Sequence, residues 1–556
     1  MVAISAPSWT TRLIGLGIFA NCFLFYYLFS TPAYPEPHHT SPDDFPWFPS
    51  HPYVEVVYPE DPATWPYRAY KSSPFTPPFL TITTNEGELA DGYLFFTPKS
   101  RQGNALQQSL PVIMSQDNEL VYCFDYPGGP NDFRVQEIQG KPHLTVWQGH
   151  SKHGHGFGEW LYMDDGYVIN KIRFNGTAIH AKLKNPPPNF LDFHEHEVTP
   201  RGSVLVSVYN TTQYNLTSLG GRADGWINDS QFYEIDIATN EVLFSWSALA
   251  HFNVSQSRLP LPSYLSDGSE SRPHDFFHLN SIQALGDNAF LVSSRHYWAC
   301  YAISRATGEV LWELNGSGEP GAGSFGALPA EGQFRWAHHA RAHNVTDSGF
   351  DLGLFDNHNT DGDTNETSTR GLLLRVSTPP NASVAPAVLR NIQPPKRTYV
   401  ESQGSYDAAL SNGNQLMAYG LVPVIREYGP GNASSDVRWE GRFGHDSMAQ
   451  SYRVFKAPWR ATPRKWPPAL AFEKDGDGAL KAYVSWNGAT DVEYWNLYDV
   501  ELGVRMTPLG KATARGFETV IDIPRDYSGS HCIIAVAVQQ GKEVKQSNRA
   551  CYDLQV

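Results

Sequence analysis

Short apolar segments separated by Gly, Asn, Asp and Pro fill the chain between residues 80 and 460, and this pattern restricts the fold more than any other feature. Examples are residues 79–83, 203–208, 289–293 and 371–376. No stretch carries the 3.6-residue apolar stripe of an amphipathic helix. The 15 Trp, 28 Tyr and 30 Phe supply ample area for a packed core. The sequence therefore predicts an all-β fold.

A repeated hairpin narrows the architecture. Residues 233–246 and 301–312 each give an alternating strand, a Thr-Asn or Thr-Gly turn and a second alternating strand that ends in tryptophan. A polar two-strand unit of this kind is typical of the outer hairpin of a β-propeller blade.

A second, degenerate repeat carries histidines. A polar start, a short strand, a Gly or Asn turn and an apolar strand follow His194, His278 and His338, and a fourth copy without histidine starts at Gly404. In a propeller, the starts of the innermost strands face one axial channel. We therefore expect the three imidazoles to converge.

The chain divides into four parts. Residues 1–30 hold a hydrophobic helix, residues 31–80 are a Pro-rich entry segment, and residues 81–463 form the propeller. Residues 464–556 show strands at the spacing of a fibronectin-III/Ig-like β-sandwich.

The N-terminal segment and the sequons predict the secretory pathway. Arg12 precedes an apolar run over residues 13–29, which suits an uncleaved signal-anchor or a signal peptide. The body is then lumenal or extracellular, either membrane-anchored or secreted. Ten Asn-x-Ser/Thr sequons predict glycosylation at Asn175, Asn210, Asn215, Asn228, Asn253, Asn315, Asn344, Asn365, Asn381 and Asn432.

Four cysteines lie outside the apolar run, an even number for an oxidising compartment. We expect Cys532 to pair with Cys551, which is close in sequence, and Cys123 to pair with Cys300. Buried thiols are the alternative.

Charge and motifs exclude several classes of function. The net charge of −15 and the absence of a basic run exclude a nucleic-acid footprint. The chain has no phosphate-binding loop, so no nucleotide cofactor is expected. His153 with His155, and His194 with His196, each form half a zinc site without a third ligand at useful spacing, so no metal site is expected either.

Five elements in order resemble the PAPS-independent arylsulfotransferases, including their fungal members. They cover much of residues 80–463 and comprise residues 193–202, 275–281 with 293–296, 334–341 with 354–357, 412–428, and 452–459. The resemblance implies a six-bladed propeller and no cofactor. It also implies sulfuryl transfer from a phenolic sulfate to a phenolic acceptor through a sulfo-histidine.

Motif matching assigns the roles within that resemblance. His338 would be the nucleophile, while His194, His278 and Arg295 would bind and polarise the sulfuryl group. Asn280, His296 and Arg341 would contact substrate. The chemistry suits these residue types, because cations and N–H donors stabilise charge on the equatorial oxygens of a migrating group.

This sequence departs from the family pattern at two positions beside the nucleophile. Ala337 and His339 stand where the family has Gln and Asp. Two alternatives therefore stay open. The histidine channel would serve acid–base chemistry on a phenolic or polyketide metabolite, such as a cyclisation, or the chain would be a non-catalytic glycosylated binding protein.

Overall fold

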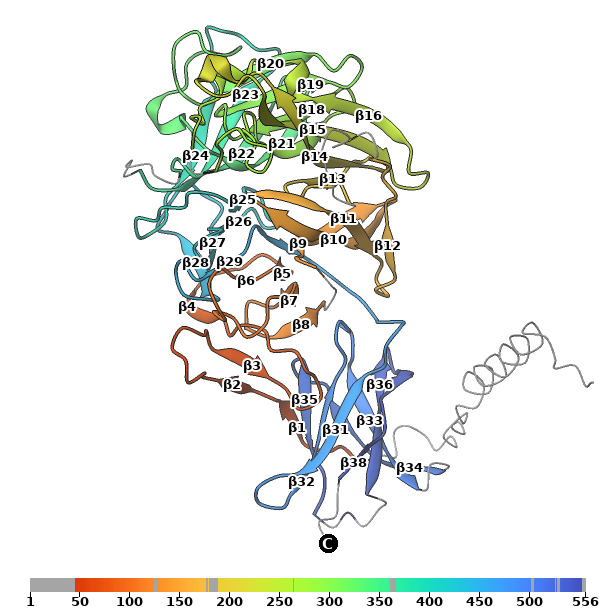
Figure 1. The fold of residues 1–556 in the computed structure, drawn as a ribbon. Helices are drawn as coiled ribbons and strands as arrows, with labels where there is room; N and C mark the ends of the chain where they lie inside the picture. The colour runs from red at the N-terminus through yellow and green to blue at the C-terminus, as the bar shows by residue number, and fades with distance from the viewer. Residues whose placement is uncertain are drawn as a thin grey trace, which may run out of the picture.

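A computed structural model describes residues 46–552 except 125–127, 177–178, 180–188, 264, 361–366, 502–504, 526 and 528–530. Six antiparallel sheets make up its larger part (Figure 1). The first three are β9 (Asn131–Ile138), β10 (Lys141–Lys152), β11 (His155–Met163) and β12 (Ile169–Lys171); β13 (His196–Val198), β14 (Ser203–Tyr214), β15 (Gly225–Asp236) and β16 (Val242–Ser247); and β17 (Leu279–Leu285), β18 (Ala289–Ser294), β19 (Ala299–Ser304) and β20 (Val310–Asn315).

Two of the remaining three sheets combine strands from both ends of this region. They are β21 (His338–Thr346), β22 (Gly349–Asp356), β23 (Arg370–Ser377) and β24 (Ala387–Ile392); β25 (Ser405–Asp407), β26 (Gln415–Ala418), β27 (Val424–Tyr428), β28 (Val437–Arg442) and β4 (Thr81–Asn85); and β30 (Val454–Ala457), β5 (Tyr93–Phe96), β7 (Val112–Met114) and β8 (Leu120–Cys123). Because β30 pairs with β5, the last of these sheets joins the end of the region to its beginning.

The first strands of the six sheets contact one another in a ring. Strand β9 contacts β13, and the contacts continue through β17, β21 and β25 to β30, which contacts β9 again. The six sheets therefore surround a common centre, and a residue at the start of a first strand lies near that centre.

Burial explains which strands alternate in sequence and which do not. Every residue of β18 and β22 and the first seven of β14 are buried, because neighbouring sheets cover both faces. The outer strands β16 and β20 have exposed residues between half-buried and buried ones. Continuous apolar runs thus mark the middle strands and alternation marks the outer ones.

Both predicted hairpins are present. Residues 233–246 fall in the β15–β16 hairpin and residues 301–312 in the β19–β20 hairpin. Asn240 and Gly308 in the turns have positive φ values of 63° and 77°, which Asn and Gly adopt at low cost. Apart from single 3-10 turns, no helix occurs in the part of the chain that the structure describes. The all-β prediction is confirmed.

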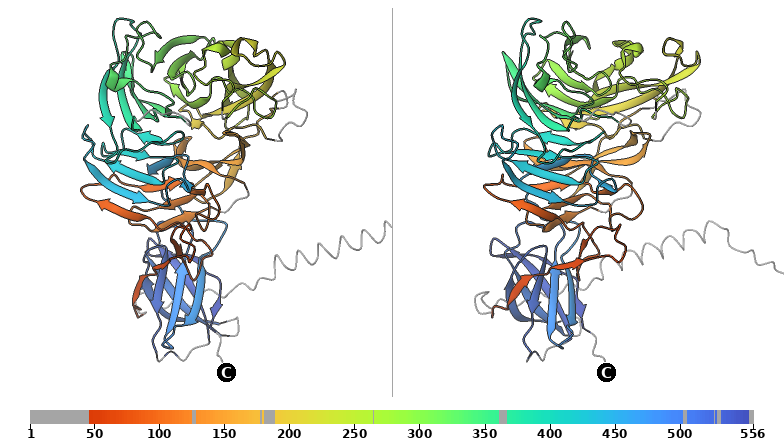
Figure 2. Two further views of the ribbon diagram at one scale, coloured as in Figure 1. Left: turned by 60° about the vertical axis from the view of Figure 1, so that its left-hand side comes forward. Right: turned by 90° about the vertical axis from the view of Figure 1, so that its left-hand side faces the viewer.

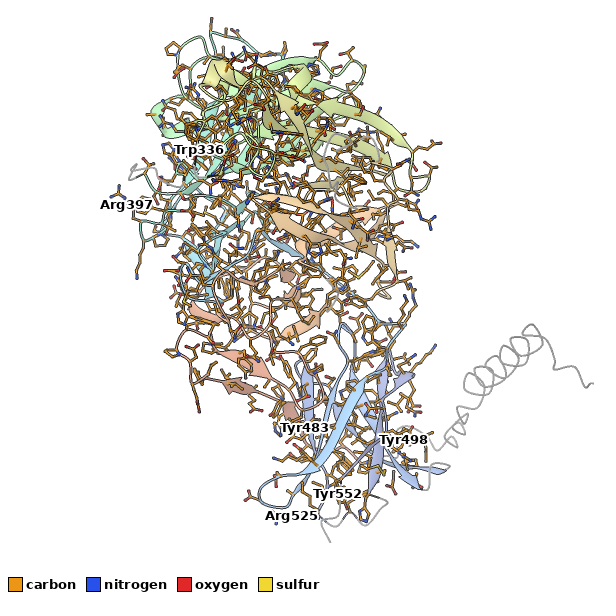
Figure 3. All side chains as sticks on the ribbon, viewed as in Figure 1. Trp336, Arg397, Tyr483, Tyr498, Arg525 and Tyr552 are labelled. Atoms are coloured by element: carbon orange, nitrogen blue, oxygen red, sulfur yellow. A yellow bond between two sulfur atoms is a disulfide. The ribbon has the colours of Figure 1, made fainter. Side chains whose placement is uncertain are left out.

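Two further sheets lie at one end of the ring (Figures 1 and 2). They are β1 (Ser50–Pro52), β35 (Glu518–Asp522), β32 (Leu480–Ser485) and β31 (Ala469–Lys474); and β34 (Arg505–Thr513), β33 (Tyr494–Glu501), β36 (Cys532–Gln539) and β37 (Lys542–Gln546), with β38 (Ala550–Cys551) beside β36. They share one core that includes Trp486, Trp495 and Ile533. Figure 3 places the labelled Tyr483, Tyr498 and Tyr552 in these sheets, far from Trp336 in the ring.

The entry segment belongs to both parts. Its strand β1 pairs with β35, a contact that the sequence did not suggest. The remaining short elements are β2 (Glu55–Val57), β3 (Tyr67–Ala69), β6 (Lys99–Ser100), β29 (Ala449–Gln450), η2 (Thr217–Leu219), η3 (Ala248–Ala250), η4 (Val254–Gln256) and η5 (Ala330–Gly332). The division at residues 80 and 463 stays a prediction.

One of the two predicted disulfides forms. Cys532 and Cys551 are bonded on neighbouring strands. The prediction that Cys123 pairs with Cys300 is wrong for this structure, because the two described residues pack in different core clusters. Burial raises the pKa of the Cys300 thiol to about 12.

Thiol labelling checks this assignment. We expect peptides that contain Cys123 or Cys300 to react with iodoacetamide at pH 8 only after unfolding, since the thiolate is the nucleophile and both side chains are buried. Peptides with Cys532 or Cys551 should require reduction as well. Labelling of Cys300 in the native protein would contradict the burial described here.

The sequons differ in their surroundings. Asn228 is buried and its Oδ1 accepts a hydrogen bond from Thr211, which argues against the predicted glycan at this position. Asn365 and the apolar segment at residues 1–30 lie outside the described residues. Among the described residues, no helix is long and apolar enough to cross a membrane. The other eight sites stay predictions.

Candidate active site

The three histidines of the repeat meet at the centre of the ring. His194 precedes β13, His278 precedes β17, and His338 begins β21. The rings of His194 and His278 lie 4.7 Å apart. The ring of Tyr452 lies 5.7 Å from His194 and 6.3 Å from His338. The convergence expected from the repeat is therefore present. His194, His278 and His338 are called the histidine cluster below.

Each imidazole of the cluster is fixed through its Nδ1 atom. Asp192 Oδ1 lies 2.5 Å from Nδ1 of His194, and Asp275 Oδ2 is bonded to Nδ1 of His278. The Nδ1–H of His338 donates to the amide oxygen of Asn357 at 2.7 Å. Nδ1 therefore contacts a carboxylate in His194 and His278, and a neutral amide oxygen in His338.

The amide beneath His338 determines where its lone pair lies. Because Nδ1 donates to Asn357, Nε2 carries the lone pair, and it accepts a hydrogen bond from the backbone N–H of Gln403 at 3.0 Å. Burial and the nearby charge of Arg295 hold the pKa of His338 well below 6.5. The imidazole is therefore neutral at physiological pH, as a nucleophile requires.

The surroundings of His278 and Asp275 determine which of the two is charged. Burial, with the charges of His194 and Arg295, lowers the pKa of His278 to about 4, although Asp275 opposes the shift. Burial alone would raise the pKa of Asp275, but His278 and His155 hold it well below 3.8. Asp275 is thus a carboxylate beneath a neutral imidazole.

Arg295 is held in place by its neighbours. It donates to Nε2 of His296 at 2.8 Å and to the carbonyl of Glu401 at 2.8 Å, and it lies over the ring of Trp336 at 5.2 Å. His296 in turn donates from Nδ1 to the carbonyl of Asp275 at 2.5 Å. Both nitrogens of His296 are used, so the structure assigns it to positioning Arg295 rather than to substrate contact.

Asn280 retains a donor for a ligand. Its Oδ1 accepts from the backbone N–H of His339 at 3.2 Å, while its Nδ2 is fully buried without a protein partner. A buried donor without a partner is costly and is typical of a site that a ligand completes.

Arg341 does not join the cluster. It donates to Glu195 Oε2 at 2.7 Å. This pair belongs to a buried ion network that consists of Asp132, Arg134, Glu195, Arg341 and Arg453. The structure therefore gives Arg341 a role in holding sheets together, and the predicted substrate contact is corrected.

The backbone is strained around these residues. His278, Trp336, His339 and Gln403 have φ values of 52°, 53°, 53° and 66°. Such conformations cost about 1–3 kcal/mol each in residues with a Cβ and gather at functional sites. The strain sets the directions in which His278 and the Gln403 N–H point.

Several residues of the site were not predicted. They are His155, Asp192, Asp275, Asn357 and Tyr452. The spacings Asp-x-His at residue 194 and Asp-x-x-His at residue 278 were available as a signal, because a carboxylate so close in sequence can reach Nδ1. Tyr452 and His155 come from distant parts of the chain. The pair His153 and His155 was a local signal, but nothing in the sequence linked His155 or Tyr452 to the histidine cluster.

Cavities lie beside the cluster and away from it. A cavity of about 240 Å³ is lined by His155, Phe157, Tyr209 and Pro273 among others. The rings of His155 and Tyr209 lie 5.8 and 6.1 Å from that of His278. A larger, apolar cavity of about 390 Å³, lined by Tyr122, Tyr167 and Trp466, lies between the ring and the C-terminal sheets and has no part in this chemistry.

These features define an all-β protein with a buried histidine and arginine site at the centre of six sheets. A family model described as arylsulfotransferase (ASST) matches residues 134–444, more than half of the chain. The chain therefore belongs to the arylsulfotransferase family.

The comparisons with solved structures give only weak similarities. The chain is similar to a protein of unknown function from Bacteroides caccae, at 12% identity over 66% of this chain and 99% of that one, with a TM-score of 0.33. The β-propeller domain of Cps50 (Swd1) from Myceliophteria thermophila matches at 9% identity over 80% and 100%, with a TM-score of 0.30. The WD40 domain of Toxoplasma gondii coronin matches at 8% over 82% and 91%, with a TM-score of 0.26. Scores this low support no argument. No curated protein matches the chain.

Proposed function

We propose that this protein transfers a sulfuryl group from a phenolic sulfate to a phenolic acceptor through a sulfo-histidine on His338. The observation that carries the proposal is the meeting of His194, His278 and a neutral His338 beside the fixed cation of Arg295. The family match supports the same class of activity.

The first half-reaction forms a nitrogen–sulfur bond. Nε2 of His338 gives up the hydrogen bond from Gln403 and attacks sulfur, while the bond from sulfur to the phenolic oxygen breaks. The electron pair leaves with the phenolate, which takes a proton from His194. Asn357 holds the proton on Nδ1 of His338 as positive charge develops.

Charge on the sulfuryl oxygens is stabilised by donors already in place. Arg295 supplies a cation whose position is fixed by His296 and Glu401, and Asn280 supplies its unpartnered Nδ2–H. Fixed donors of this kind need no reorganisation during the reaction. In the second half-reaction an acceptor phenol gives its proton to the same histidine, and its oxygen takes the sulfuryl group from Nε2.

The proposal extends to architecture and compartment. The six sheets would be the blades of a six-bladed propeller that β30 and β5 close, and the C-terminal sheets a fibronectin-III-like sandwich. The sequons and the apolar N-terminal run support a glycoprotein of the secretory pathway, anchored or secreted.

Intact mass spectrometry tests the reaction. The purified chain is exposed briefly to 4-nitrophenyl sulfate while nitrophenolate release is followed. We expect a mass gain of one sulfuryl group that disappears when phenol is added. A folded sample with neither adduct nor release would refute the proposal and favour acid–base chemistry in the same site or a binding role.

The lowered pKa of His338 predicts a pH dependence for the first half-reaction. An imidazole whose pKa lies well below 6.5 keeps its lone pair as the pH falls. We therefore expect that protonation of His338 does not slow adduct formation between about pH 8 and pH 6, as measured by the single-turnover rate. A rate that falls tenfold per unit below about pH 6.5 would show an unshifted histidine.

A further inference from the structure

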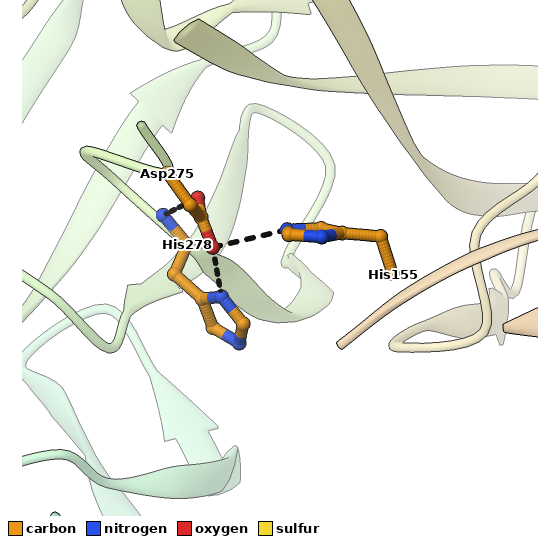
Figure 4. A group of neighbouring side chains, drawn as sticks. All are labelled: His155, Asp275 and His278. Carbon is orange, nitrogen blue, oxygen red and sulfur yellow. Dashed lines mark hydrogen bonds and ion pairs between the residues drawn. The ribbon is translucent and has the colours of Figure 1, made fainter. Parts of the chain in front are cut away.

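The carboxylate of Asp275 lies between the imidazoles of His155 and His278 (Figure 4). Its Oδ2 accepts a hydrogen bond from Nε2 of His155 at 3.0 Å and another from Nδ1 of His278. All three side chains are buried, and the three atoms lie within 4.8 Å of one another. His155 begins β11 and the other two precede β17, so two sheets build the group.

We propose that these three side chains bind a divalent transition-metal ion of the zinc type and leave one coordination position open. Two imidazoles and a carboxylate are the protein ligands of many catalytic zinc sites, where a water or substrate takes the fourth position. Imidazole also favours zinc-like ions over magnesium or calcium, which prefer all-oxygen sites.

Binding of an ion requires the three ligand atoms to shift. Ligand atoms about 2.1 Å from a tetrahedral ion are about 3.4 Å from one another. The 3.0 Å separation between His155 Nε2 and Asp275 Oδ2 would therefore lengthen by a few tenths of an ångström, and the shorter contact between Asp275 Oδ2 and His278 Nδ1 would lengthen by more. The ion would replace the two protons that the carboxylate now shares with the imidazoles.

The outer contacts that such sites need are also present. Oδ1 of Asp275 accepts from the backbone N–H of His278 at 3.2 Å and so fixes the carboxylate. The amide of buried Asn228 lies 3.5 Å from Nδ1 of His155. With a metal on Nε2, the His155 proton moves to Nδ1, and a half-turn of the amide presents an oxygen to it.

An ion also has a path to the site. His155 lines the cavity of about 240 Å³, together with Lys152, His153 and Glu270. His153, two residues away, is exposed and bonds to the carbonyl of Ser271 instead of joining the group. The group therefore borders a cavity while its three ligands stay buried, as a closed protein site requires.

Metal binding would alter the donor properties of His278. A metal on Nδ1 leaves the proton on Nε2, so that His278 becomes an N–H donor from its other nitrogen. This consequence rests on the proposed function, because only a sulfuryl group or departing phenolic oxygen bound in the histidine cluster would accept from that N–H. The binding of the ion itself does not rest on it.

The full chain, freed of metal by dialysis against a chelator, is titrated with Zn²⁺ by calorimetry and with Co²⁺ by visible absorption. We expect saturable binding of one ion per chain and a cobalt spectrum typical of low coordination number. His155→Gln and Asp275→Asn should each weaken binding at least about 10-fold, the cost of losing even an outer partner. His153→Gln is the matched control and should bind as the wild type does.

The outcomes separate the two proposals. No saturable binding by the wild type, or equal affinity in folded His155→Gln, Asp275→Asn and His153→Gln variants, would overturn the metal site and leave a carboxylate that only accepts hydrogen bonds. Circular dichroism establishes that each variant is folded. Site-dependent binding in a protein that never transfers a sulfuryl group would support the metal site and refute the proposed function alone.

Discussion

Replacement of His338 with alanine is expected to lower nitrophenolate release from 4-nitrophenyl sulfate by about 10⁴-fold or more and to abolish the sulfuryl adduct. Loss of the nucleophile removes the covalent route itself, and effects of this size follow removal of a nucleophile in other enzymes. The donors that remain, Arg295 and Asn280, have no atom that can take the sulfur. Rate and intact mass are measured on the same samples.

His343→Ala is the control for this variant. His343 lies on the same strand, β21, and is half-buried, but no ring contact or hydrogen bond joins it to the histidine cluster among the contacts described. We expect its adduct and its rate to match the wild type. If His338→Ala still forms the adduct, the nucleophile is another residue. If both variants lose activity equally, the loss reflects damage to the strand.

Asn357→Asp tests how the nucleophile is held. A carboxylate in place of the amide would raise the pKa of His338, because it favours the imidazolium. We therefore expect adduct formation to become dependent on pH near neutrality while the folded structure is kept. An unchanged pH profile in Asn357→Asp would mean that the neutral amide does not set the protonation of His338.

Sequence predicted the starts of the inner strands and what they bring together. The second repeat placed His194, His278 and His338 at equivalent positions. In a ring of sheets, equivalent positions at the starts of the first strands lie close together at the centre. The turns at Asn240 and Gly308 were equally visible, because a positive φ favours those residue types. Such features are local in sequence, so one chain is enough to find them.

Partners from distant strands were the part that sequence could not supply. Arg341 matched a family motif, yet Glu195, 146 positions away, takes its guanidinium. His155 had no third metal ligand at useful spacing in the sequence, whereas the carboxylate of Asp275, which it contacts, comes 120 positions later. Cys123 and Cys300 were the two cysteines left after Cys532 was paired with Cys551. An even number of cysteines does not show that two of them are close enough to bond. Only the order of sheets around the ring determines these contacts.

Replacement of Glu195 with alanine is expected to lower the free energy of unfolding by about 3–5 kcal/mol, the usual cost of breaking a buried ion pair from one side. Glu195 accepts from Arg134 at 2.9 Å, from Arg341 at 2.7 Å and from Arg453 at 3.3 Å. These arginines stand on or beside β9, β21 and β30, and Glu195 itself precedes β13. One side chain thus links four of the six sheets through buried charges.

The pKa of Glu195 gives the sign of a pH effect. Burial would raise this pKa, but Arg341, Arg453 and Arg134 lower it below 4.5. A carboxyl whose pKa is lower in the folded than in the unfolded state stabilises the fold above its unfolded pKa. That contribution is present at neutral pH and is lost as the pH falls below about 4.5. Glu195→Ala should therefore differ most from the wild type at neutral pH, and the difference should narrow in acid.

Glu159→Ala supplies the comparison, because Glu159 forms an exposed pair with Lys171 on the surface of the same ring. We expect its loss to change the unfolding free energy by less than about 1 kcal/mol. Urea denaturation of both variants, followed by circular dichroism at neutral pH and in mild acid, measures the difference. Equal midpoints for Glu195→Ala and Glu159→Ala at neutral pH would mean that the ion network does not hold the ring together. Packing of the apolar faces of the sheets would then be enough to hold the ring together. Arg134, Arg341 and Arg453 would have to bond to water or to another acceptor in place of Glu195.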